Sequence, residues 1–130
     1  MLNKKDIIKI IKDMKLPLGE YWVTSGAALV LHEVKETTKD IDLGCTTQLA
    51  EQYIKKGCKY RVSKNNIRII KVNDTIEMLE NWFADKIIFI DGLPAGSLES
   101  IKKQKAQLGR AKDIEDIKLI DDYIKRTMDV

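Results

Sequence analysis

Residues 21–43, YWVTSGAALVLHEVKETTKDIDL, carry the strongest structural signal in the chain. They begin with an aromatic and β-branched run, Tyr21–Thr24, which favours a short strand. Ser25-Gly26 follows, and Ala27–Leu31 is a run of helix-forming and apolar residues. Polar and apolar residues then alternate from Lys39 to Leu43, as in a strand that buries one face. The stretch therefore predicts a strand, a tight turn, a helix and a second strand.

The neighbouring segments add a helix on each side and further strands. Ile7, Ile11 and Met14 recur at helical spacing, and Asn3 precedes them as a candidate N-cap with an acid three residues later. Residues 47–56 again have a helical pattern. Beyond Gly57 we expect a meander of antiparallel strands, at residues 60–62, 67–72 and 75–79.

The C-terminal part of the chain predicts one more strand and two helices. The strand covers residues 86–90, and Asp91-Gly92-Leu93-Pro94 is expected to end it. The helices follow at residues 97–108 and 113–126, and the acidic first turn of the second one suits a helix N-terminus. The predicted fold class is α/β, more narrowly α+β: a mixed, mostly antiparallel sheet with helices packed against it.

Length and composition indicate a single domain that spans residues 1–130. The chain has a mass of 14.9 kDa, and 44% of its residues are hydrophobic, which is enough to bury a core. Its 23 Lys and Arg residues against 20 Asp and Glu residues give a net charge of only +3, and these charges are scattered. Charge alone therefore names no partner.

Cysteine usage and hydropathy favour a protein of the cytoplasm. Cys45 and Cys58 are too few for a disulfide framework, and neither belongs to a zinc-binding motif. Lysines interrupt the isoleucines of the first 14 residues, so we expect no signal peptide. No run approaches the roughly 20 apolar residues of a membrane-spanning helix, so we expect no membrane partner.

Asp40 and Asp42 are the first candidates for chemistry. In a strand they point to one face, while Ile41 and Leu43 point to the other. Two neighbouring carboxylates repel each other unless a cation neutralises them, and their hard oxygen atoms favour Mg²⁺ or Mn²⁺. The alternative is a solvated strand face above a core that contains the two apolar residues.

Ser25-Gly26 is the second candidate, because it lies where a strand turns into a helix. Gly26 allows a sharp turn of the backbone, and the free N–H groups of the next turn can bind an anion. The Ser25 hydroxyl could also bind a phosphate. The alternative is an ordinary N-cap followed by a glycine.

Together, the helix start, the paired aspartates and a later acid resemble the nucleotidyltransferase superfamily with the polymerase-β-like fold. In that family a strand is followed by Gly-Ser or Gly-Gly, then by a helix and by a strand with Asp-x-Asp. A later strand carries a third carboxylate. Here Ser25-Gly26, Asp40 and Asp42 match, and Glu77 is the candidate third carboxylate. Small bacterial members related to abortive-infection toxins and antibiotic nucleotidyltransferases are similar at residues 27–32, 36–43, 97–101, 105 and 109–116. The resemblance extends from about Tyr21 to about Ile120.

The resemblance implies a metal-dependent enzyme that transfers a nucleotidyl group, first of all AMP from ATP, to a hydroxyl acceptor and releases pyrophosphate. Asp40, Asp42 and Glu77 would be catalytic and would hold Mg²⁺ or Mn²⁺. The residues expected to bind the triphosphate are Ser25, Gly26, Lys39, Lys105, Arg110 and Lys112. The acceptor stays open between a small molecule, a tRNA and a protein, as does a role in a toxin–antitoxin system or in antibiotic resistance. Since larger members bind the acceptor with an additional domain, a homodimer is a candidate assembly.

Two alternatives to an active enzyme stay open at this point. The order Ser25-Gly26 departs from the family pattern, Glu33 stands where the family has a glycine, and the third carboxylate is Glu77 rather than an aspartate. These departures allow a degenerate module that binds a nucleotide or a partner without turnover. The other alternative is RNA or DNA binding by a basic run next to Tyr60, which consists of Arg61, Lys64, Arg68 and Lys71.

Overall fold

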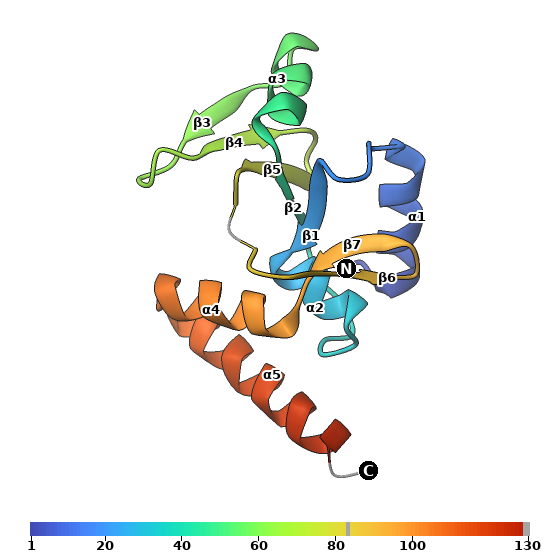
Figure 1. Ribbon diagram of the computed structural model, residues 1–130, viewed down its shortest axis with the longest axis vertical. Coiled ribbons are helices and arrows are strands. Elements are labelled where there is room, and N and C mark those ends of the chain that lie inside the picture. The colour runs from blue at the N-terminus through green and yellow to red at the C-terminus, as the bar shows by residue number, and fades with distance from the viewer. Residues whose placement is uncertain (83, 129–130) are drawn as a thin grey trace.

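The computed structural model describes residues 1–82 and 84–128. Its elements in chain order are α1 (Lys4–Met14), β1 (Tyr21–Thr24), α2 (Ser25–Leu31), β2 (Ile41–Cys45), α3 (Thr47–Lys55), β3 (Tyr60–Val62), β4 (Arg68–Lys71), β5 (Ile76–Glu80), β6 (Ile87–Ile90), β7 (Leu93–Gly96), α4 (Leu98–Leu108) and α5 (Ala111–Met128). The predicted fold class is confirmed, since helices pack against a mixed sheet (Figure 1).

The strands form a sheet in the order β3-β4-β5-β2-β1-β7-β6. The pairs β2–β5 and β1–β7 are parallel, and the other pairs are antiparallel. The expected meander β3-β4-β5 is therefore present, and β5 also lies beside β2. In this register Asp42 of β2 lies opposite Thr24 on one side and opposite Glu77 on the other. The sheet thus places two predicted site carboxylates on neighbouring strands.

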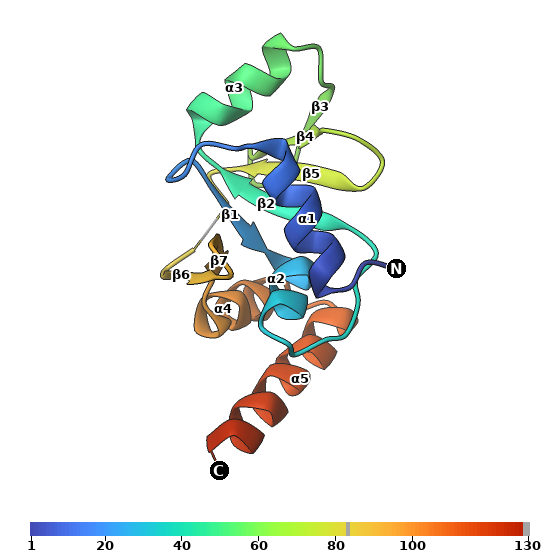
Figure 2. The same ribbon diagram turned by 90° about the vertical axis from the view of Figure 1, so that its right-hand side faces the viewer.

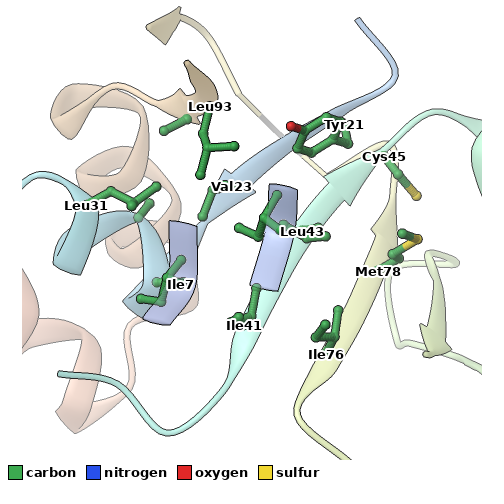
Figure 3. Packing of buried hydrophobic residues seen from close by; sticks show 14 of the residues in the cluster. Ile7, Tyr21, Val23, Leu31, Ile41, Leu43, Cys45, Ile76, Met78 and Leu93 are labelled. Atoms are coloured by element: carbon green, nitrogen blue, oxygen red, sulfur yellow. The ribbon is translucent and has the colours of Figure 1, made fainter. Parts of the chain in front are cut away.

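The two faces of the central strands have different roles. Because successive side chains point to opposite faces, Ile41 and Leu43 are fully buried in the core while Asp42 points away from it. Figure 3 shows Leu43 and Val23 of the sheet packed with Ile7 of α1. The core therefore fixes the strands whose other face carries the candidate site.

The start of α1 is the one that the sequence predicts. The side chain of Asn3 accepts a hydrogen bond from the Asp6 N–H at 2.9 Å, and the Asp6 carboxylate accepts one from the Asn3 N–H at 3.0 Å. This capping box satisfies N–H groups that a helix start leaves unpaired. α1 packs against the sheet (Figure 2) and buries Ile7 and Ile11.

Strand β7 corrects the expectation that Asp91-Gly92-Leu93-Pro94 only ends a strand. Asp91 and Gly92 have φ angles of 50° and 82° and form the tight turn of a β6–β7 hairpin. Leu93–Gly96 is buried between β1 and β6. Proline and glycine have low strand propensity, so tertiary packing and not local sequence makes this segment a strand.

Helices α4 and α5 close the C-terminal end of the fold. Ser97 caps α4, and Gly109 ends it with a φ of 62°, as expected for a helix C-cap. α5 begins at Ala111 rather than at Asp113, and its C-terminal half extends beyond the rest of the molecule (Figures 1 and 2). Although α5 has 18 residues, neither it nor any other helix in the described part of the chain is long and apolar enough to cross a membrane.

Candidate active site

A cavity of about 470 Å³ lies on the polar face of the sheet, between the strands and the elements α2, α4 and α5. All residues that the sequence predicts for catalysis or phosphate binding line this cavity: Ser25, Gly26, Lys39, Asp40, Asp42, Glu77, Lys105, Arg110 and Lys112. The wall is completed by Lys35, Thr38, Arg61, Leu79, Trp82, Leu108 and Asp116. The fold therefore brings the predicted residues together from segments that are far apart in the sequence.

Asp42 is the partly buried carboxyl group at the centre of the acidic side. Burial raises its pKa from 3.8 to about 6, and the charges of Glu77 and Asp40 act in the same direction. The positive charges of Lys112 and Lys105 oppose the increase. A divalent cation next to Asp40 and Asp42 would relieve the repulsion, and carboxylate oxygens are ligands that Mg²⁺ and Mn²⁺ prefer. The donor chemistry of this pair thus fits the cation that the sequence resemblance implies.

Glu77 already has a cationic partner, which the sequence does not predict. Arg61 of β3 donates to Glu77 from Nη1 to Oε2 at 2.8 Å and from Nη2 to Oε1 at 3.5 Å. Consistent with this pairing, no group of three or more His, Cys, Asp or Glu side chains within residues 1–82 and 84–128 is arranged as a metal site. Glu77 would have to leave Arg61 to join Asp40 and Asp42 around an ion.

The start of α2 differs from the prediction in two respects. Ser25, not Gly26, has the positive φ, 54°, and the N-cap is Thr24 rather than Ser25. Gly26 leaves room for a neighbouring side chain, because a Cβ atom there would lie 2.7 Å from Oγ1 of Thr38, which would then have to shift. Oγ1 of Thr24 donates to Oε1 of Gln104 at 3.1 Å, which ties the end of β1 to α4. This junction forms one wall of the cavity.

Two aspartates of α5 hold the basic side of the cavity. Asp113 is fully buried and accepts from Arg110, with Nε–Oδ2 at 2.6 Å and Nη2–Oδ1 at 3.1 Å. The Asp116 carboxylate lies between Lys35 and Lys105, with Nζ–O distances of 2.7 and 2.9 Å. The sequence suggests a favourable helix dipole for these acids and an N-cap role for Asp113, and it does not predict their ion pairs. Their spacing relative to the buried Ile120 is the signal for a buried face.

Both aspartates are held in the charged form by these contacts. Burial acts to raise the pKa of Asp113, but hydrogen bonds from the side chain and backbone of Arg110 outweigh it and lower the pKa. Burial likewise acts to raise the pKa of Asp116, but hydrogen bonds from Lys35 and Lys105 outweigh it and lower the pKa. Lys35, Lys105 and Arg110 therefore belong to a network of paired charges.

The basic run considered for nucleic-acid binding is mostly paired with acids. Arg61 pairs with Glu77, and Arg68 lies 2.6 Å from Glu80 and 2.7 Å from Glu51. Lys71 lies 3.4 Å from the exposed Asp74. Paired cations release fewer counterions when a phosphate backbone binds, so this face offers weaker attraction than the residue types alone suggest.

The sequence matches no protein-family model and no curated protein. Similar solved structures do exist. The crystal structure of ANT(2'')-Ia in complex with adenylyl-2''-tobramycin has a TM-score of 0.58 and 16% identity, over 91% of this chain and 85% of that chain. The solution structure of the antibiotic-resistance factor ANT(2'')-Ia has a TM-score of 0.59 and 17% identity, over 91% of this chain and 80% of that chain.

A third similar structure comes from Thermotoga maritima, from a protein assigned as a nucleotidyltransferase. Its TM-score is 0.61 and its identity is 16%, over 90% of this chain and 93% of that chain. At these identities the likeness shows the fold alone. The chain has the nucleotidyltransferase fold, as its sequence motifs suggest.

Proposed function

We propose that this protein transfers a nucleotidyl group, AMP from ATP in the first instance, to a hydroxyl acceptor with release of pyrophosphate. One observation carries the proposal: on a nucleotidyltransferase fold, a single cavity is lined on one side by Asp40 and Asp42 and on the other by basic side chains. A triphosphate needs the basic side, and a divalent cation needs the acidic side.

Asp40 and Asp42 would hold Mg²⁺ or Mn²⁺, and Glu77 would join them after release from Arg61. Such an ion, when bound, lowers the pKa of an acceptor hydroxyl and offsets the negative charge of the phosphates. The raised pKa of Asp42, which reflects burial and acidic neighbours, supports a cation at this position, because a positive charge would favour the carboxylate form. Metal binding is thus supported by the environment of Asp42 as well as by the family resemblance.

The side chains around the acids would orient the substrates. Lys105 of α4, Arg110 of the junction between α4 and α5, and Lys112 of α5 would bind the phosphates. Ser25-Gly26 and Lys39, which line the same cavity, would bind them as well. A carboxylate oxygen of Glu77 would accept the proton of the acceptor hydroxyl. Catalysis of this kind consists mainly of positioning and charge stabilisation.

A nucleotide-binding module without turnover is the second candidate function. The ion pair between Arg61 and Glu77 favours it, because the third carboxylate is already engaged by a guanidinium group. In that case magnesium-dependent ATP binding would occur without pyrophosphate release.

The test is incubation with α-labelled ATP, CTP, GTP or UTP, Mg²⁺ and a cell extract, followed by separation of labelled products. We expect an acceptor to become labelled and pyrophosphate to be released. Asp42→Asn should abolish the label, whereas Asp121→Asn, which pairs with Lys102 of α4 and does not line the cavity, should leave it unchanged. Transfer by Asp42→Asn at the wild-type rate would disprove the assignment.

A further inference from the structure

The cations of the basic wall of the cavity come from separate segments, and Lys112 belongs to α5. Lys35 comes from the loop after α2, Lys105 from α4, and Arg110 from the junction between α4 and α5. Figure 2 shows how the loop that follows α2 passes the first turns of α5. The only direct link between Lys35 and Lys105 among the ion pairs of the described residues is the Asp116 carboxylate, at 2.7 and 2.9 Å.

The position of Asp116 is not explained by the needs of the helix. Asp113, one turn earlier, accepts from the Arg110 N–H at 3.2 Å and so helps to start α5. Asp116 has no such role, yet its side chain is only 11% exposed, and that of Lys105 is 9% exposed. A buried ion network of this kind is weak evidence for stability, because desolvation offsets much of the attraction between the charges. A role in placing the lysines accounts for the arrangement better.

The network leaves the wall with a surplus of positive charge. Lys35, Lys105, Arg110 and Lys112 line the cavity. The carboxylates of Asp113 and Asp116 pair with the first three of these cations and not with Lys112, so that the four cations and two carboxylates leave a net charge of +2. Long lysine side chains lose rotamer entropy when they bind a ligand. Holding their ammonium groups in place beforehand reduces that loss, so a polyphosphate would bind more tightly.

We propose that Asp116 is a positioning residue, which orders Lys35 and Lys105 as a binding site for the polyphosphate of the substrate, with Asp113 placing Arg110 beside them. This inference rests on the proposed function, since it assigns the triphosphate to this wall of the cavity. It names a ligand class, linear polyphosphates, that can be tested without any transfer reaction.

The test measures binding of inorganic tripolyphosphate by calorimetry, in EDTA and at low salt. Wild type should bind, and Asp116→Asn should bind about tenfold more weakly because the two lysines are no longer held. Electrostatic attraction alone predicts tighter binding by Asp116→Asn, since the substitution raises the positive charge of the wall by one. Asp121→Asn is the matched control, because Asp121 also pairs with a lysine of α4, Lys102, but does not line the cavity.

A double-mutant cycle separates positioning from a general structural role. In a Lys35→Met background, Asp116→Asn should cost much less affinity than in wild type, because the residue acts through the lysine that is already gone. Asp116→Glu should recover part of the affinity. Circular dichroism of each variant checks that it is folded, and Lys35→Met alone, in a partly exposed loop, tests the wall if Asp116→Asn does not fold.

Three results would each overturn the inference. They are equal or tighter binding by Asp116→Asn, equal effects of that substitution with and without Lys35, and no binding of tripolyphosphate by wild type. Weaker binding with a non-additive cycle supports it. If that pattern holds while no labelled acceptor is found in any extract, the proposed transfer activity fails and the polyphosphate site stands.

Discussion

Replacing Asp42 by asparagine should stabilise the protein at neutral and alkaline pH. The carboxyl group has a folded-state pKa of about 6, raised first by burial and then by Glu77 and Asp40, against an ordinary value of 3.8. That difference corresponds to roughly 3 kcal/mol. Because the pKa is raised, the fold favours the protonated form; this contribution to stability is fully present below pH 3.8 and is lost as the pH rises through 6. The charged Asp42 therefore costs stability above pH 6.

The assay is urea unfolding of both proteins in EDTA, followed by circular dichroism. At pH 8 the free energy of unfolding of Asp42→Asn should exceed that of wild type by roughly 2 to 3 kcal/mol, and near pH 4 the gain should fall below about 1 kcal/mol. Added Mg²⁺ should stabilise wild type and not the variant. Asp74→Asn is the control, since that side chain is 98% exposed.

A gain of the same size at both pH values would refute this reasoning, because titration of the Asp42 carboxyl group is what makes the effect of this substitution depend on pH. A loss of stability at pH 8 would refute it as well. Either result would mean that the acids are farther apart, or better solvated, than the cavity suggests.

Further predictions concern the neighbours of the site and the cysteines. Arg61→Met removes the partner of the third carboxylate, so Mn²⁺ titrated by electron paramagnetic resonance should bind severalfold more tightly. Gly44→Ala should lower the free energy of unfolding by about 1 to 3 kcal/mol in urea titrations, because its Cβ would overlap the Trp22 indole on the paired strand. At pH 8 a disulfide reagent should label Cys58 and leave Cys45 unmodified, as mass spectrometry can show, because burial raises the pKa of the Cys45 thiol to about 12.

The parts of the fold that depend on local sequence could be predicted. Asn3 and Ser97 cap helices because their short polar side chains bond to nearby backbone N–H groups. The alternation around Asp40 and Asp42 predicts which residues leave the core, since strand geometry fixes the face. These signals were sufficient to find the acidic side of the cavity.

The parts that depend on contacts between distant segments could not be predicted. β7 is a strand because β1 and β6 bury it, although Pro94 and Gly96 disfavour that state. The pairing of Arg61 with Glu77 depends on the order of β3, β4 and β5 in the sheet. Likewise, Lys35 meets Asp116 only because α5 packs beside the loop after α2, which no local pattern encodes.

A crystal structure with Mn²⁺ and a non-hydrolysable ATP analogue would decide whether this cavity is the active site. Anomalous scattering should place manganese at the carboxylates of Asp40 and Asp42, with the phosphates against Lys105 and Arg110. Manganese and nucleotide bound elsewhere, or the cavity left without either at saturating concentrations, would contradict the account.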